Sequence, residues 1–345
     1  MAKVLVAMSG GVDSSVAAFL LREMGHECVG VTLKLWGGES DSGCCSVSDV
    51  EDARRVADQI GIKHTVFNFS EVFEEKVVDH YVDSYARGRT PNPCIECNRS
   101  IKFAALLERA QRLGFDYLAT GHYARIGRDD DGAFLLRGED REKDQSYVLS
   151  MLQREQLEKL MLPVGDLAKP AVREIARAQG LRTANKPDSL EVCFIPQRTG
   201  HDIFLGRRIP LTRARLQVGD ELYDAPEGVH VETLTIGQRR GLGTVGDSRR
   251  RYVVKKDHER GVVTLGSERD LHVQEQRIES VTWSRPSYAT LGAFEVQGAA
   301  HGPTVAAELV DDRLVYREAR RMIAPGQTVA FYVEKKVIGS AVISE

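Results

Sequence analysis

The chain has 345 residues and a mass of 38.3 kDa, which at roughly 100 to 200 residues per domain predicts two or three domains and excludes a single small module. Apolar residues make up 42% and charged residues 28% of the chain, which excludes a disordered or collagen-like protein. The formal charge is −3, so no overall basic field marks a nucleic-acid partner, and any site for a polyanion must be local.

Apolar runs such as Val4–Met8 and Val29–Leu35 have the length of strands and fall far short of the ~20 residues that cross a bilayer. The N-terminus enters an apolar run directly, without the zones of a signal peptide. We therefore expect a cytoplasmic protein with no membrane partner. Its six cysteines should be reduced by default in that compartment, which makes them candidates for catalysis or metal binding.

The first half of the chain alternates strands with helices. Apolar runs and helical periodicity predict strands at 3–8, 28–34, 64–68 and 117–120 and helices at 14–24, 49–60, 71–87, 101–113, 153–160 and 171–179. This alternation predicts an α/β fold: a doubly wound parallel sheet with helices on both faces and a ligand site at the carboxyl ends of its strands.

Beyond about residue 205 the helical periodicity fades. Short β-rich runs at 229–234, 252–255 and 262–265 predict a small, mostly β middle domain. Runs at 277–283, 304–309, 328–332 and 337–343 are enough for a small C-terminal antiparallel barrel or sandwich, of which we expect the β-barrel. The expected domains are 1–205, 206–275 and 276–345.

The segment Ser9–Ser15 (SGGVDSS) lies between the first predicted strand and helix. Backbone N–H groups and the helix dipole bind anions at such a junction, and Gly10 and Gly11 let the backbone approach a phosphate closely. A bare GG-x-D could equally be a turn with a helix cap, but the position after the first strand favours a phosphate site. A second glycine, Gly121, follows the strand at 117–120 and is by itself a weak signal of nucleotide binding.

Two cysteine segments carry further chemistry. Cys97 lies in the proline-rich loop Thr90–Asn98, whose prolines limit backbone freedom, and a helix is expected to begin near Ser100, where its N-terminus would favour a thiolate. Cys193 stands among apolar residues, and its local sequence alone favours a buried core cysteine over a reactive one. Cys28 lies in a predicted core strand and is expected to serve packing.

The SGGVDS string resembles the signature of the PP-loop ATP pyrophosphatases, which cleave ATP between its α and β phosphates. Together with GRTPNPCIECN, IKF, ATGHYAR, KDQSYVL, DSLEVCFI and TIGQRRGLG, it resembles the bacterial tRNA-specific 2-thiouridylases of the MnmA type; these strings are spread over residues 9–243 in family order. The resemblance implies ATP-dependent thiolation of the wobble uridine (U34) of tRNA, with adenylation of its C2 oxygen, release of AMP and pyrophosphate, and sulfur supplied by a cysteine persulfide. It also implies Lys, Glu and Gln tRNAs as substrates and an upstream protein as sulfur donor.

The resemblance also implies site residues. Cys97 is the thiol beside the target base and Cys193 the persulfide carrier, with a Cys97–Cys193 disulfide as the product of sulfur transfer. Asp13 is a candidate ligand of the Mg²⁺ that would accompany ATP. The expected ATP site consists of Ser9, Gly10, Gly11, Val12, Asp13, Ser14, Ser15, Leu33 and Gly121. The expected tRNA contacts are Asn92, Pro93, Cys94, Lys143, Asp144, Gln145, Arg249, Arg250 and Arg251.

Cys94 departs from the family pattern, because many members have Asp at this position after TPNP. An acid or base role of that Asp cannot be carried over to this chain. Cys94, Cys97 and Cys193 could instead ligate a [4Fe-4S] cluster with one open iron; we favour Cys94 as an additional thiol in a persulfide enzyme. A structural zinc site built from Cys44, Cys45, Cys94 and Cys97 is disfavoured, because the adjacent Cys44 and Cys45 are poorly spaced as ligands.

Two local basic clusters offer a track for RNA phosphates. Residues 239–260 hold eight Lys or Arg against three acidic residues, and residues 198–215 hold five Arg against one. Such runs are usually solvated surface, yet two of them in a slightly acidic chain favour RNA binding. Two other functions are consistent with part of these motifs. The first is an amidotransferase-coupled or argininosuccinate-type synthetase, which the paired cysteine segments disfavour. The second is a non-catalytic, metal-stabilised RNA-binding protein, which the SGGVDSS loop disfavours.

Overall fold

The computed structural model describes residues 1–36, 46–188, 192–195, 200–243, 245 and 249–344. Its N-terminal part is built on a five-stranded, all-parallel sheet in the order β3-β2-β1-β4-β7. The strands are β1 (Lys3–Ala7), β2 (Glu27–Lys34), β3 (Lys63–Asn68), β4 (Tyr117–Ala119) and β7 (Leu160–Met161). Short apolar runs buried on both faces are typical of parallel sheets, and the predicted doubly wound α/β class is confirmed.

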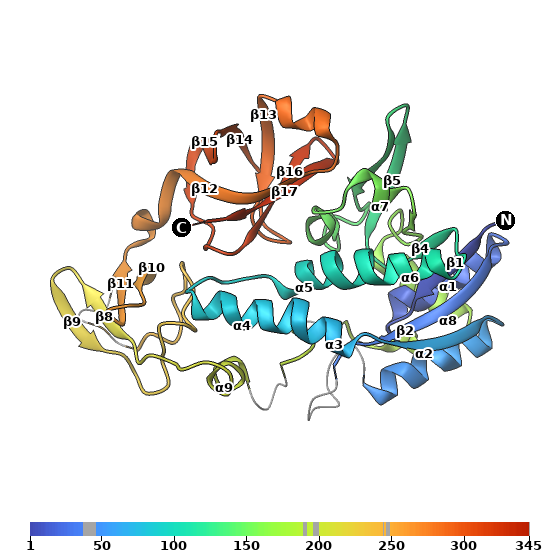
Figure 1. Ribbon diagram of the computed structural model, residues 1–345, viewed down its shortest axis with the longest axis horizontal. Helices are drawn as coiled ribbons and strands as arrows, with labels where there is room; N and C mark the ends of the chain where they lie inside the picture. The colour runs from blue at the N-terminus through green and yellow to red at the C-terminus, as the bar shows by residue number, and fades with distance from the viewer. Residues whose placement is uncertain (37–45, 189–191, 196–199, 244, 246–248, 345) are drawn as a thin grey trace.

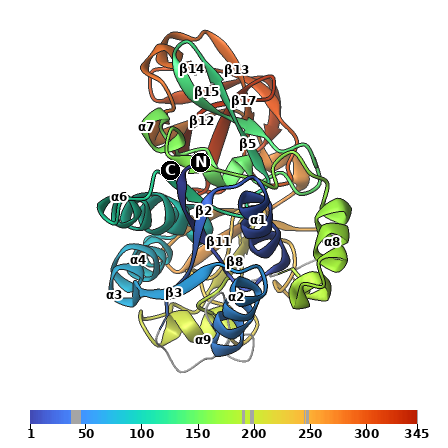
Figure 2. The ribbon, with the colours of Figure 1, turned by 90° about the vertical axis from the view of Figure 1, so that its right-hand side faces the viewer.

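Helices cover both faces of this sheet (Figure 2). One face carries α1 (Val12–Glu23), α2 (Val47–Gln59) and α8 (Lys169–Ala178), and the other carries α3 (Ser70–Phe73), η1 (Glu74–Val78), α4 (Asp79–Ala86), α5 (Pro93–Glu96), η2 (Cys97–Leu106) and α6 (Leu107–Arg112). Shorter helical turns complete this part: η3 (Ser146–Leu149), α7 (Arg154–Leu157), η4 (Arg182–Asn185) and α9 (Gly200–Gly206). Two separate hydrophobic cores result, one on each side of the sheet.

The helix that carries Cys97 begins earlier than the sequence predicts. The elements α5, η2 and α6 follow one another without a break from Pro93 to Arg112, whereas a start near Ser100 is expected from the sequence. Asn92 caps the first turn by accepting from the Cys94 N–H at 3.1 Å, and Pro93 stands at the first helical position, which is where proline is tolerated. Cys94 therefore lies in the first turn, and Cys97 lies one turn further along.

The middle part is a four-stranded sheet in the order β10-β11-β8-β9. Its strands are β8 (Arg215–Val218), β9 (Glu221–Asp224), β10 (Tyr252–Asp257) and β11 (Val262–Gly266). The predicted strand at 229–234 is wrong, because only His230 makes an isolated bridge there. Val231 and Leu234 are still buried in the core of the middle part, but they lie in a turn and in irregular structure rather than in a strand.

The C-terminal part is a β-barrel, as predicted. Six strands close on themselves in the order β12-β15-β14-β13-β16-β17, with β17 pairing back to β12. They are β12 (His272–Trp283), β13 (Ala293–Gln297), β14 (Val305–Val310), β15 (Arg313–Arg321), β16 (Thr328–Val333) and β17 (Lys336–Ile343), with η5 (Glu268–Leu271) before the barrel and η6 (Pro286–Thr290) within it.

A hairpin from the N-terminal part joins the barrel sheet. It consists of β5 (Ala124–Asp129) and β6 (Gly132–Arg137), and β6 pairs with β17. Arg285, which is 5% exposed, donates to Asp129 and to the Gly132 carbonyl and so fastens the hairpin to the barrel. Figure 1 shows the resulting arrangement, with the barrel beside the hairpin and the middle sheet at the far end of the molecule. None of the helices in the described ranges is long and apolar enough to span a membrane.

Candidate active site

The loop Ser9–Ser15 connects β1 to α1 and places the first helical turn at the carboxyl edge of the sheet. Gly10 has φ +74° and packs against the backbone of Asp49, where a side chain would not fit. A Cβ on Gly121 would lie 2.6 Å from the Ser14 nitrogen, so that glycine lets the end of β4 press against the loop. The Ser14 hydroxyl accepts from the Ser9 N–H at 3.1 Å and the Ser15 hydroxyl donates to the Gly11 carbonyl at 2.8 Å. The loop is thus folded tightly at the place where the sequence predicts phosphate binding.

Among the described residues that line the adjoining cavity, only Asp13 has an acidic side chain. Its carboxylate accepts a hydrogen bond of 2.6 Å from the Tyr123 hydroxyl, and both of its oxygens lie 2.7 Å from the Lys169 ammonium. Burial and the neighbouring Asp13 raise the pKa of Tyr123 well above its usual value, so the phenol remains a donor. The role of Asp13 as a magnesium ligand stays a prediction.

Lys169 also contacts Asp188, at 2.8 Å, and Asp188 accepts from Lys143 and Arg173 at 2.9 Å each. Burial raises the pKa of Asp188, but hydrogen bonds and charge from Lys169 and Lys143 outweigh it and hold the pKa at about 2. Lys169 is only 7% exposed, so a buried ammonium bridges the phosphate loop to the segment that precedes Cys193. Sequence reasoning missed Lys169 and Tyr123, although Tyr123 stands in the ATGHYAR string.

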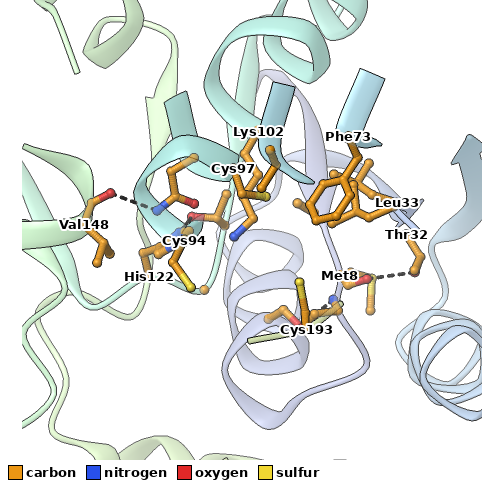
Figure 3. A pocket seen from close by; sticks show the side chains of 18 of the residues that line it. Met8, Thr32, Leu33, Phe73, Cys94, Cys97, Lys102, His122, Val148 and Cys193 are labelled. Carbon is orange, nitrogen blue, oxygen red and sulfur yellow. Dashed lines mark hydrogen bonds between the residues drawn. The ribbon is translucent and has the colours of Figure 1, made fainter. Parts of the chain in front are cut away.

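A cavity of about 380 Å³ opens beside the loop (Figure 3). Its wall includes Ser9, Asp13, Ser14, Leu33 and Gly121 from the expected nucleotide site and Pro93, Cys94, Cys97, Gln145 and Cys193 from the expected thiol and tRNA site. Cys94 and Cys97 come from α5 and η2, and Cys193 lies on the other side of the cavity (Figure 3). Cys97 is buried, Cys193 is partly exposed and Cys94 is exposed. Cys97 and Cys193, which are 96 positions apart in the chain, thus line the same cavity as the phosphate loop.

Further polar residues that were not singled out from the sequence also line this cavity, among them Asn98, Lys102 and His122. Asn98 is 2% exposed and donates to the Val148 carbonyl at 2.9 Å, which ties η2 to η3. Burial, and then the charge of Lys102, lower the pKa of His122 well below its usual value, so the imidazole is neutral at pH 7. The IKF and ATGHYAR strings were the available signals for Lys102 and His122.

The stretch Lys143–Gln145 makes intramolecular contacts. The Lys143 ammonium is bound to Asp188 at 2.9 Å. Asp144 is 6% exposed and accepts from Arg137, from the Gly138 N–H, and from both the N–H and hydroxyl of Ser146. Gln145 exchanges hydrogen bonds with the Tyr123 backbone. These bonds fix the stretch against Tyr123 and Asp188.

The remaining expected residues lie as follows. Val12 is buried in the first turn of α1, and Asn92 caps α5. Arg249 and Arg250 are exposed and Arg251 is half-buried, just before β10 of the middle sheet. Cys28 is buried in β2, where burial raises the pKa of its thiol, in keeping with a packing role. Cys44 and Cys45 lie outside the described residues.

The three cysteines of the cavity do not fit a cluster. Within the described part of the chain, no three His, Cys, Asp or Glu side chains come together in a way that could hold a metal ion. Since Cys94, Cys97 and Cys193 all belong to that part, their placement does not match the three-thiolate set that a [4Fe-4S] cluster requires.

Comparison with known proteins covers nearly the whole chain. Residues 2–197 match the model of the tRNA methyl transferase HUP domain, residues 226–267 that of the tRNA methyl transferase PRC-barrel domain, and residues 273–343 that of the aminomethyltransferase beta-barrel domain. The chain is 47% identical to the tRNA-specific 2-thiouridylase MnmA of Mycobacteroides abscessus, over 99% of both chains. It is 43% identical to the protein of that name from Geobacter metallireducens, over 98% of this chain and 95% of that one.

Among solved structures, the U34-tRNA thiolase NcsA from Methanococcus maripaludis with its [4Fe-4S] cluster aligns with a TM-score of 0.37 and 19% identity, covering 55% of this chain and 60% of that chain. Similarity at that level carries no functional argument. The full-length relatives and the three successive domain matches agree with the fold and with the order of the sequence strings. The chain therefore belongs to the tRNA-specific 2-thiouridylase family.

Proposed function

We propose that the chain catalyses ATP-dependent 2-thiolation of the wobble uridine, U34, of tRNA. The observation that carries this proposal is the single cavity shared by the phosphate loop and by Cys94, Cys97 and Cys193. A synthetase that used an amine nucleophile would have no use for thiols on that wall. The similarity to tRNA-specific 2-thiouridylases supports tRNA as the substrate and 2-thiouridine as the product.

In the first step ATP adenylates the C2 oxygen of the uridine and pyrophosphate leaves. The loop Ser9–Ser15, at the N-terminus of α1, supplies backbone N–H groups and the positive end of the helix dipole to the departing phosphates. The neutral His122 adds no charge to the wall, and Lys102 supplies a cation on the same wall as Cys97. The C2–O–AMP group turns a poor leaving oxygen into a good one.

In the second step the terminal sulfur of a Cys193 persulfide attacks C2, and AMP departs with the C2 oxygen. The Cys97 thiolate then attacks Sγ of Cys193, which breaks the persulfide S–S bond and leaves the outer sulfur on C2. The products are 2-thiouridine and a Cys97–Cys193 disulfide, and a thiol reductant must return both cysteines to thiols before the next turnover. Transfer of the electron pair from Cys97 balances the step without a metal.

The target base must leave the anticodon stack to enter the cavity, which costs a few kcal/mol that contacts to the rest of the tRNA offset. The basic residues before β10, Arg249 to Arg251, are proposed phosphate contacts for this purpose. Lys, Glu and Gln tRNAs are the proposed substrates, and an upstream protein persulfide is the proposed sulfur source.

The test is a reconstituted reaction with tRNA, ATP, Mg²⁺ and a small-molecule persulfide donor. Nucleosides of the digested tRNA are quantified by mass spectrometry, and nucleotide products are resolved with α-labelled ATP. The proposal predicts 2-thiouridine together with an equal amount of AMP, and neither product without tRNA. Formation of ADP instead of AMP, or AMP release without sulfur in the tRNA, would contradict it.

A further inference from the structure

The segment between α4 and α5 is contacted by both other domains. This segment follows the C-terminus of α4 and precedes the helical turn that carries Cys94, and it includes Gly88, Arg89 and Thr90. Figure 1 shows this segment at the place where the barrel and the middle domain approach the N-terminal helices. We call these three residues, with Pro325, Gly326 and Gln327 of the barrel, the clamp.

The barrel side of the clamp holds both peptide groups of Thr90. The Thr90 N–H donates to the Pro325 carbonyl at 2.8 Å, and the Gln327 amide donates to the Thr90 carbonyl at 2.6 Å. Gly326 has φ +88°, and a Cβ there would lie 2.9 Å from the Cβ of Arg89 and 3.0 Å from the Thr90 nitrogen. The turn leaves no space for a side chain against the segment.

The barrel turn is itself held firmly. The Gly326 N–H donates to the Ile343 carbonyl at 2.8 Å, and the Ile343 N–H donates to the Gln327 carbonyl at 2.9 Å, at the end of β17. Arg89 adds an ion pair of 2.5 Å with Glu279 of β12. The segment is therefore fixed to the closed barrel rather than to a loose loop.

The middle domain contacts the same segment. The hydroxyls of Thr90 and Thr235 lie 3.3 Å apart. Gly88 has φ +77° and lies directly against the ring of His258, so closely that a Cβ would overlap it. Three consecutive residues thus bring all three domains into contact.

Little backbone freedom separates this junction from the thiols. Pro91 and Pro93 fix φ on either side of Asn92, and Asn92 caps the helix that carries Cys94 and Cys97. A displacement of Thr90 is consequently passed on to the first turn of α5 instead of being absorbed by a flexible linker.

We propose that Gly326 and Gln327 are positioning residues for Cys97, so that the barrel and middle domain set the place of this thiol in the cavity. The inference rests on the proposed thiolation, because the position of Cys97 matters only for attack on the Cys193 persulfide. Misplacement of a reacting group by about 1 Å can cost on the order of a hundredfold in rate.

The test uses the full chain with Gly326→Ala, which forces a Cβ against Thr90, and Gln327→Ala, which removes one hydrogen bond and leaves the turn's backbone intact. Gly228→Ala is the matched control, because Gly228 also has positive φ, +80°, but nothing lies within 4 Å of its added Cβ. The readouts are the single-turnover thiolation rate at saturating tRNA and ATP, the Kd of each substrate, and the alkylation rate of Cys97 measured by peptide mass spectrometry.

We expect both clamp variants to lower the single-turnover rate by about ten- to a hundredfold, with Kd values within about twofold of wild type, and to raise alkylation of the buried Cys97. The Gly228→Ala control should retain the wild-type rate. If Gln327→Ala keeps the wild-type rate and Cys97 alkylation, or if its loss lies wholly in the tRNA Kd, the positioning role is refuted. A wild-type protein that binds ATP and tRNA but forms no 2-thiouridine would instead refute the proposed function.

Discussion

Replacing Lys169 with methionine tests the ion-pair network behind the phosphate loop. The change removes a buried ammonium that bridges Asp13 and Asp188. Breaking a fully buried pair costs about 3–5 kcal/mol, but the two carboxylates are 30% and 27% exposed and keep other partners. We therefore expect a loss of about 2 kcal/mol, and a fall in Tm of about 4–8 °C at 2–4 °C per kcal/mol for a domain of this size.

The pH dependence follows from Asp188. Its folded pKa of about 2 lies below the unfolded value of about 3.9. A carboxylate whose pKa is lowered in the folded state stabilises the fold fully above its unfolded pKa, and this stabilisation is lost as the pH falls through its folded pKa. The stability gap between wild type and Lys169→Met should therefore be constant above about pH 5 and should narrow as the pH falls from about 4 toward 2.

The assay is thermal unfolding followed by tryptophan fluorescence in a Trp283→Phe background. Of the two tryptophans, Trp283 lies in the barrel and Trp36 packs in the N-terminal core, so the remaining signal reports the N-terminal domain. Lys143→Met is the control, because Lys143 also pairs with Asp188 but is 40% exposed and should cost less than about 1 kcal/mol. An unchanged Tm for Lys169→Met at pH 7 would show that the Lys169 ion pairs do not stabilise the fold. A difference in stability between wild type and Lys169→Met that is as large at pH 3 as at pH 7 would show that Asp188 is not the group responsible.

Four further sets of substitutions test other parts of the molecule. Asp13→Ala and Ser14→Ala should abolish AMP formation while tRNA still binds, and loss of tRNA affinity with intact ATP turnover would refute the assignment of the loop. Reversing Arg249, Arg250 and Arg251 to Glu should weaken tRNA binding and flatten its salt dependence; an unchanged slope in binding titrations would make the cluster ordinary surface. Cys94→Ser should retain much of the single-turnover thiolation, whereas Cys97→Ser and Cys193→Ser should each be inactive; an inactive Cys94→Ser beside an iron-containing wild type would favour the cluster. Burial, opposed by the charge of Glu232, lowers the pKa of Lys256 to about 8, below its unfolded value of about 10.4. The unfolded state therefore binds more protons between about pH 8 and 10.4, and the free energy of unfolding should rise there by about 3 kcal/mol, a rise that urea titrations should not find in Lys256→Met.

The sequence predicts the parallel sheet and the barrel because local periodicity and turn residues define them. The position of the hairpin β5–β6 could not be predicted in this way, because it depends on pairing with β17, some 200 positions later in the chain. The start of the helix that carries Cys97 could have been predicted from Asn92 and Pro93, since an Asn cap followed by proline is a helix-start signal. The division into 1–205, 206–275 and 276–345 remains a prediction.

The cavity could be predicted only in part. Sequence strings located the loop and the two cysteine segments, but the ion pair between Asp13 and Lys169 joins residues 156 positions apart, and no spacing rule reveals such a contact. The same holds for Thr90 and Gln327, 237 positions apart. These long-range contacts depend on the packing of domains against one another, which is absent from any local pattern.

The central claim is that sulfur passes from Cys193 to an ATP-activated uridine in one cavity. The most direct measurement is a single turnover with protein whose Cys193 carries a ³⁵S-labelled outer persulfide sulfur, purified free of donor and then mixed with tRNA. We expect label to move to tRNA only when ATP is added, with one AMP formed per sulfur transferred and a Cys97–Cys193 disulfide left on the protein. Label that stays on the protein while AMP is released, or that moves to tRNA without ATP, would rule out this route of sulfur transfer.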